Sequence, residues 1–129
     1  MTTSKAKGIG SVYAFEIDIT GSSSSTGVIA SLQNTTGKDL FIVAHGLQIV
    51  TQSTGASTLD IGYTATSATT SSDTLIDGLS GAAAGYFTTP GTNGKAITRW
   101  MAGKWINVAE ASGDVDGLVA KFHFLAKEL

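Results

Sequence analysis

Thr58-Leu-Asp-Ile-Gly-Tyr63 is the stretch that decides the fold class, because bulky apolar residues alternate in it with a carboxylate and a glycine. Side chains of an extended chain point alternately to opposite sides, so its apolar residues share one face. These residues are Leu59, Ile61 and Tyr63. The alternation predicts a β-strand that buries this face and leaves Asp60 and Gly62 on the other.

The residues that follow predict a solvent-exposed connection and then a tight turn. A run rich in Thr and Ser leads to Asp73-Thr-Leu-Ile-Asp-Gly78. Asp73 is of the type that caps the start of a helix, and Gly78 is of the type that ends one. We therefore expect a short helical turn that contains Leu75 and Ile76.

The same alternation recurs toward both ends of the chain. Residues 11–20 place four large apolar side chains on one face, namely Tyr13, Phe15, Ile17 and Ile19. Residues 118–127 place five apolar residues inward, namely Leu118, Ala120, Phe122, Phe124 and Ala126. Lys121 and His123 then point outward. Each segment predicts a strand with one face in the core.

The middle of the chain predicts further strands with turns between them. Residues 40–50 are almost continuously apolar, and Gly46 interrupts them, which predicts two strand pieces joined by a bulge or a bend. Pro90-Gly-Thr-Asn-Gly94 is the clearest turn signal, and residues 111–117 predict a hairpin connection. Together the patterns give about eight strands and no long amphipathic helix. They indicate an all-β antiparallel sandwich or barrel.

Composition sets limits on the number of domains and on the partners. A chain of 129 residues supports one domain, which we expect over residues 11–129, with residues 1–10 as a flexible arm. Charged residues make up 14%, and the net charge of −2 gives no electrostatic attraction to nucleic acid or an anionic membrane. Because the chain has no Cys, disulfides, thiol catalysis and thiolate metal sites are excluded.

The candidate catalytic residues fit structural roles better. His45 lies in an apolar strand and is expected to be packed or in an interface, and His123 is expected to be a polar neighbour on an outer face. No Gly-x-Ser-x-Gly turn is present to support a hydrolase. A hydrolase therefore ranks last among the functions considered, and we expect no enzyme.

The aspartates do not form a recognisable metal site. Asp114-Val-Asp-Gly117 begins like a calcium loop, but the position of the bidentate Glu is taken by Phe122 or His123. Asp60, Asp73 and Asp77 could converge on an ion, although turn capping explains them as well. We expect no metal and no cofactor.

The large aromatics leave a second function open. Small β-sandwiches use exposed aromatic rings to stack on sugars, whereas buried rings dominate cores and subunit interfaces. The residues concerned are Tyr63, Tyr86, Trp100 and Trp105. The alternative to a purely structural role is therefore a carbohydrate- or receptor-binding module.

Three segments resemble small structural proteins of tailed bacteriophages. The segments are the strand 58–62, the turn 73–78 and the terminal Gly117-Leu-Val-Ala-Lys-Phe-His-Phe124. The proteins that they resemble are jelly-roll proteins of the capsid surface, such as decoration (cement) proteins and head-fibre bases. In general organisation the similarity extends over residues 8–129, and its specific part is residues 58–78 and the final hairpin.

The resemblance implies a jelly-roll β-sandwich that is made in the host cytoplasm and becomes part of the virion. Its implied function is to bind the outer surface of the head and stabilise contacts between major capsid subunits. It also implies a homotrimer, and an arm that grips the shell. Lys5 and Lys7 are the candidate capsid-binding residues, unless residues 1–10 are a plain disordered terminus. Phe87, Trp100 and Trp105 are the candidates for the subunit interface. The alternative is a carbohydrate- or receptor-binding module of a fibre or tail.

Overall fold

The described residues form nine β-strands. In the computed structural model, the described residues are 11–22, 27–68, 72–88, 91, 94, 95 and 97–129. The strands are β1 (Val12–Thr20), β2 (Gly27–Gln33), β3 (Leu40–Thr51), β4 (Ser57–Thr64), β5 (Ile76–Ser80), β6 (Gly85–Phe87), β7 (Thr98–Trp100), β8 (Trp105–Gly113) and β9 (Val119–Glu128).

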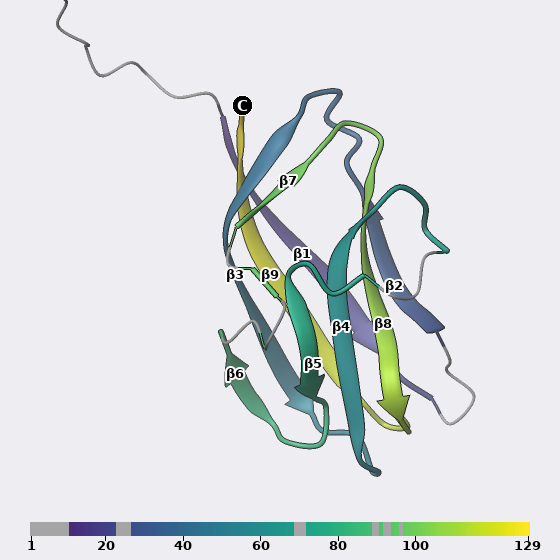
Figure 1. Cartoon of the computed structure of the whole chain (residues 1–129). Helices are drawn as coiled ribbons and strands as arrows, with labels where there is room; N and C mark the ends of the chain where they lie inside the picture. Colours follow the sequence, from purple (N-terminus) through teal and green to yellow (C-terminus); the bar gives the residue numbers. More distant parts are fainter. Residues whose placement is uncertain (1–10, 23–26, 69–71, 89–90, 92–93, 96) are drawn as a thin grey trace, which may run out of the picture.

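The strands form two antiparallel sheets that face each other (Figure 1). Sheet A has the order β1-β9-β3-β6, with β7 also paired to β3, and sheet B has the order β2-β8-β4-β5. The expectation of an all-β antiparallel sandwich is confirmed. The number of strands is nine instead of about eight, because two short strands, β6 and β7, pair with different parts of β3.

The strand pairing is nested, as in a long hairpin that has been rolled up. The first strand pairs with the last, β2 pairs with β8, β3 pairs with β6 and β7, and β4 pairs with β5. Along the first half of the chain, each strand crosses to the opposite sheet. This order makes the sandwich jelly-roll-like.

The hydrophobic core lies between the two sheets. All five residues predicted to point inward from residues 118–127 are buried, and so are Ile17 and Ile19. From sheet B the core receives Leu59, Ile61, Ile106 and Val108. Burial of this apolar surface is the main favourable contribution to folding. It also fixes which residues face outward on each strand.

The irregularities of β3 against β9 are not at Gly46, as predicted, but on either side of it, and the second lies between Ile49 and Thr51. The register shifts between Ile42 and Ala44, and Gly46 is paired with His123. Ile42 and Leu47 are both buried although they are an odd number of residues apart. A regular strand would put them on opposite faces, so an extra residue is needed between them. That extra residue is Val43.

The predicted helical turn at residues 73–78 is wrong, because these residues lead into β5. Ile76 pairs with Ile61, and Leu79 pairs with Leu59. Pairing with β4 buries both Leu75 and Ile76, which a solvent-exposed helical turn would not do. Tertiary pairing therefore overrides the local capping pattern.

The residues between β4 and β5 lie partly against the outer face of sheet B. A Cβ atom at Gly62 would overlap Ser72, so the glycine permits this close approach. Asn107 on β8 donates a hydrogen bond to the carbonyl of Thr66 (2.9 Å) and is buried. On the outer face of sheet A, by contrast, Ala14, Glu16, Ala44 and Leu125 are exposed.

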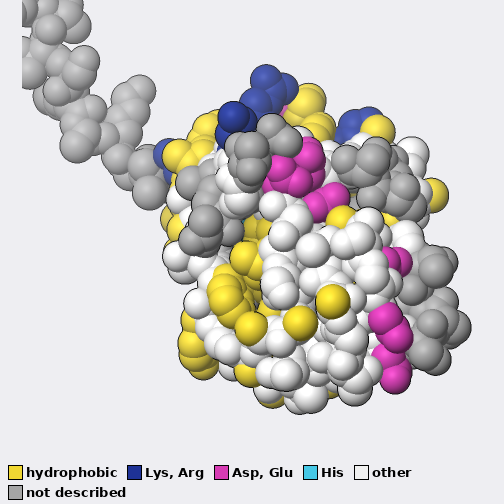
Figure 2. Space-filling view, turned by 60° about the horizontal axis from the view of Figure 1, so that its bottom comes forward, with side chains coloured by type: hydrophobic (Ala, Val, Ile, Leu, Met, Phe, Trp, Pro, Cys, Tyr) yellow, Lys and Arg dark blue, Asp and Glu magenta, His cyan; other side chains and the backbone are white. Residues whose placement is uncertain are grey.

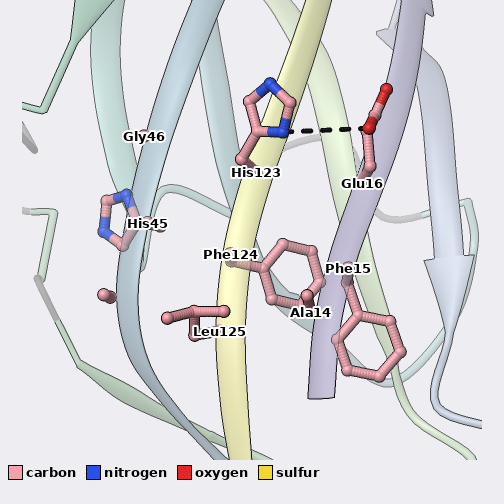
Figure 3. A pocket seen from close by; sticks show the side chains of 9 residues that line it. Ala14, Phe15, Glu16, His45, Gly46, His123, Phe124 and Leu125 are labelled. Carbon is pink, nitrogen blue, oxygen red and sulfur yellow. Dashed lines mark ion pairs between the residues drawn. The ribbon is translucent and has the colours of Figure 1, made fainter.

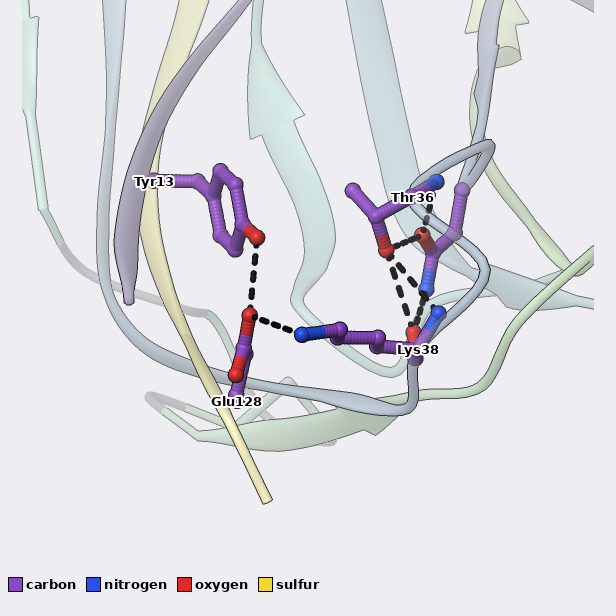
Figure 4. A network of polar contacts seen from close by, with 5 residues as sticks. Tyr13, Thr36, Lys38 and Glu128 are labelled. Atoms are coloured by element: carbon purple, nitrogen blue, oxygen red, sulfur yellow. Dashed lines mark hydrogen bonds and ion pairs between the residues drawn. The ribbon is translucent and has the colours of Figure 1, made fainter. Parts of the chain in front are cut away.

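A polar cluster joins the end of β9 to the loop between β2 and β3 (Figure 4). The hydroxyl of Tyr13 donates to Glu128 Oε1 (2.9 Å), and Lys38 Nζ lies 3.1 Å from the same oxygen. The hydrogen bonds from Tyr13 and Lys38 hold the pKa of the Glu128 carboxyl below its ordinary value. The cluster holds the last strand of sheet A against this loop.

Asp60 on β4 helps to hold β5. Its Oδ1 accepts a hydrogen bond from the backbone N–H of Gly78 (2.7 Å). Burial raises the pKa of the Asp60 carboxyl, and the nearby carboxylates of Asp77 and Asp73 raise it further, against the effect of this hydrogen bond. Asp60 therefore satisfies a backbone N–H of β5 at the place where the register between β4 and β5 shifts.

We expect Asp60→Asn to stabilise the protein slightly at neutral pH. A carboxyl whose pKa is raised by folding favours the folded state when protonated, and this contribution is lost as the pH rises through the folded pKa. Asparagine keeps the oxygen that Gly78 needs but removes the charge, so unfolding should cost up to about 1 kcal/mol more than for the wild type. The difference should vanish below the ordinary pKa of an aspartate.

Urea unfolding at neutral and acid pH measures this effect. Asp114→Asn is the matched control, because Asp114 is exposed and its Oδ1 also accepts a backbone hydrogen bond, from Asp116 (2.9 Å). An equal gain for both variants, or a gain for Asp60→Asn that persists at acid pH, would contradict this explanation.

Candidate interaction surface

The middle of the outer face of sheet A presents three consecutive rows of residues across β1, β9 and β3. Antiparallel pairing sets Ala14, Leu125 and Ala44 side by side in the first row. The second row contains Glu16, His123 and Gly46, and the third contains Asp18, Lys121 and Gln48. The face therefore changes from apolar to charged along the strands.

A groove of about 350 Å³ lies over the first two rows (Figure 3). It forms where the outward residues are small, at Ala14, Ala44 and Gly46. Leu125 adds an apolar side chain to the groove and is itself 43% exposed. The groove offers an apolar floor with a charged edge, a surface suited to binding another chain.

Glu16 and His123 form the charged edge of the groove. His123 Nδ1 lies 3.9 Å from Glu16 Oε2, and His123 points toward Glu16 across the space between β9 and β1 (Figure 3). Lys121 Nζ donates to Glu16 Oε1 at 2.7 Å. This hydrogen bond holds the pKa of the Glu16 carboxyl below its ordinary value. Glu16 is therefore charged at neutral pH.

The polar row continues from His123 to β6. His123 Nε2 donates to Gln48 Oε1 (3.3 Å), and Gln48 Nε2 donates to the hydroxyl of Tyr86 (3.3 Å). His123 thus lies on the outer face as a polar neighbour, which agrees with the sequence prediction. These contacts orient side chains and present no activated nucleophile.

His45 lies at the margin of the groove and belongs to the packed interior of β3. It is opposite Phe124 in the register, and its ring centroid is 5.4 Å from that of Phe122. Its Nε2 donates to the carbonyl of Lys95 (2.9 Å). The prediction of a packed histidine agrees with this placement. The described residues contain no group of three or more His, Cys, Asp or Glu that could hold a metal ion.

The predicted site residues are not brought together. Trp100 is 0% exposed, so its side chain has no surface to offer a second subunit, and its assignment to an interface does not fit this burial. Its indole packs against Phe15 and Phe124 at centroid distances of 5.0 and 5.4 Å. Phe87 and Trp105 are half-buried, and their interface role stays a prediction. The predicted capsid-binding residues Lys5 and Lys7 lie outside the described residues.

The groove is the feature that sequence reasoning missed. Alternation along single strands indicated which residues face outward, but not that Ala14, Ala44 and Gly46 lie near one another. Only the register of β1, β9 and β3 brings these small residues together. A glycine or alanine at outward positions of two separate strands, β1 and β3, was the available signal.

The surface outside the groove carries few charges. In the view of Figure 2, most of the visible surface consists of uncharged polar side chains and backbone, and charged side chains stand in small separate groups. This agrees with the 14% of charged residues in the sequence. No helix in the described part of the chain is long and apolar enough to cross a membrane.

The comparisons with known proteins show a shared fold. No protein-family model matches the chain, and no curated protein matches it. Among solved structures, the chain is similar to a chain from the capsid of Ralstonia phage GP4, with a TM-score of 0.60 and 18% sequence identity. The likeness covers 100% of this chain and 92% of that chain. At this identity, it establishes that the two chains have the same fold.

Proposed function

We propose that this protein is a structural component of a bacteriophage virion. More specifically, it is a decoration protein that binds the outer surface of the head and stabilises contacts between major capsid subunits. The observation that carries the proposal is the shared fold over the whole chain with a chain from a phage capsid. The sequence resemblance to capsid-surface proteins supports it independently.

The described residues support a role without catalysis. Neither histidine is placed as a base beside a nucleophile, and the aspartates Asp60 and Asp114 accept backbone hydrogen bonds. A protein that decorates a lattice needs no deep pocket, because repeated weak contacts add up to strong attachment. The shallow groove and the weakly charged surface fit that kind of binding.

The finer parts of the proposal concern partners. We infer a homotrimer that contacts the major capsid protein, with Phe87 and Trp105 near the subunit interface. Lys5 and Lys7 contact the capsid surface. Phe87 and Trp105 are suitable because each is half-buried within its own chain, so each keeps apolar surface for a neighbour.

Co-sedimentation with phage heads that lack this protein tests the proposal. The purified protein should pellet with the heads and raise the temperature at which they open. Lys5→Ala/Lys7→Ala should weaken binding a few-fold, because each exposed ion pair contributes about 0.2–1 kcal/mol. Lys95→Ala/Lys104→Ala removes the same charge elsewhere and should bind normally. Protein that stays in the supernatant at saturating amounts would refute a decoration role.

A second candidate function is sugar or receptor binding in a fibre or tail. The observation that favours it is Tyr86, which lies on the outer side of sheet A and is 79% exposed. An exposed aromatic ring can stack on a sugar face. A glycan array should then give a signal that Tyr86→Ala and Trp105→Ala abolish, and an empty array would remove this candidate.

A further inference from the structure

The outer residues of β1 change in character along the strand. Ala14 belongs to the apolar floor of the groove, whereas the next two outward residues, Glu16 and Asp18, are acidic. Lys121 is shared by the two carboxylates, at 2.7 Å from Glu16 and 3.5 Å from Asp18. One cation against two carboxylates leaves a net charge of about −1, so this end of the groove attracts a cation.

Residues 1–10 carry the complementary pattern. Lys5, Lys7 and Ile9 are each two residues apart, so they would share one side of an extended chain at intervals of about 7 Å. Ala14, Glu16 and Asp18 have the same spacing on β1. A segment that runs antiparallel to β1 would place the two lysines near the two carboxylates. Ile9 would then lie over the apolar floor.

We propose that, while the protein is free of the capsid, the groove on sheet A binds residues 5–9 of a second copy of this chain. Ile9 fills the space over Ala14, Ala44 and Leu125, and its neighbours Gly8 and Gly10 let the backbone come close to the sheet. Lys7 pairs with Glu16 at the charged edge of the groove. Because the volume of about 350 Å³ exceeds that of one aliphatic side chain, the backbone of the segment also fits.

The segment must come from another copy because its own chain is too short to reach. Ser11 is held beside β9, since its carbonyl accepts a hydrogen bond from the Glu128 N–H (3.1 Å). Ala14 lies three residues further along the strand, about 10 Å from Ser11. Ile9 is only two residues from Ser11 and can be at most about 7 Å away. It therefore cannot lie over Ala14 of its own chain.

Disulfide trapping tests this exchange, because the chain has no Cys of its own. Purified Ile9→Cys protein is mixed with purified Ala44→Cys protein under mild oxidation and examined on non-reducing gels. A bound segment holds the thiols at an effective concentration near millimolar, so dimer formation should exceed that of the control mixture about tenfold or more. The control mixture pairs Ile9→Cys with Ala111→Cys, an exposed alanine on sheet B.

Light scattering of the wild-type protein and of an Ile9→Asp variant gives a second measurement. Ile9→Asp should lower the association state of the otherwise unchanged protein, since it puts a charge on an apolar floor. Equal cross-linking of Ala44→Cys and Ala111→Cys, or an unchanged association state for Ile9→Asp, would overturn the proposal. Both experiments use the protein without phage heads, so their failure would leave the capsid-binding proposal standing.

Discussion

Replacing Trp100 with alanine is expected to lower the free energy of unfolding by about 3–5 kcal/mol. Trp100 is 0% exposed and joins Phe15 and Phe124 in an aromatic cluster with edge-to-face contacts. Its indole N–H donates to the carbonyl of Lys104 (3.0 Å), so the substitution also leaves a carbonyl without its donor. Urea unfolding followed by circular dichroism measures the loss.

Trp105→Ala is the matched control for this substitution. Trp105 lies on β8, which follows β7 in sequence, and it is half-buried. Its removal should therefore lower the free energy of unfolding clearly less than the removal of Trp100. The comparison also separates the two roles considered for Trp100. A Trp100→Ala protein with normal stability but altered self-association would restore its assignment to an interface and contradict its role in the core.

Asn34→Ala is expected to lower the free energy of unfolding by about 2–4 kcal/mol, because it breaks several hydrogen bonds of a buried side-chain amide at once. Asn34 is 1% exposed and its Nδ2 donates to the carbonyls of Trp100 (2.9 Å) and Lys38 (2.8 Å). Its Oδ1 accepts from the N–H (3.1 Å) and the hydroxyl (2.7 Å) of Thr36. Without the amide, the loop after β2 loses its link to β7, and two carbonyls lose a donor.

Thermal and urea unfolding of Asn34→Ala and Thr36→Ala measure this contribution. Thr36→Ala keeps the buried amide and removes only a hydroxyl that contacts Asn34 and Lys38, so it should cost less. A loss below about 1 kcal/mol for Asn34→Ala would mean that water replaces the amide without difficulty. The buried position of the residue argues for the larger value.

Period-two alternation was enough to predict the architecture but not its irregularities. The inward residues of β9 and the buried Ile17 and Ile19 follow directly from the pattern, because one face of each strand meets the core. The bulge at Val43 does not, since it follows from the need to bury both Ile42 and Leu47. The strand β5 was also missed, because its pairing with β4 outweighs the local capping pattern.

The candidate surface was predictable only in part. Alternation places Lys121 and His123 on an outer face, and both lie there. The groove between them and Ala44 depends on the register of strands that are far apart in sequence. That register cannot be predicted from the amino-acid sequence of one chain. The burial of Trp100 was not predictable for a related reason: β7 has three residues, too few for alternation to show which face is buried.

The nested strand pairing also has a consequence for folding kinetics. β4 and β5 are neighbours in sequence, whereas β1 and β9 come from opposite ends of the chain. Closing a long loop costs more entropy than closing a short one, so the inner pair can form early and the outer pair late. Substitutions in β4 should then slow folding, while those in β1 should mainly speed unfolding. β1, one of the three strands that line the groove, would then be the last to pair.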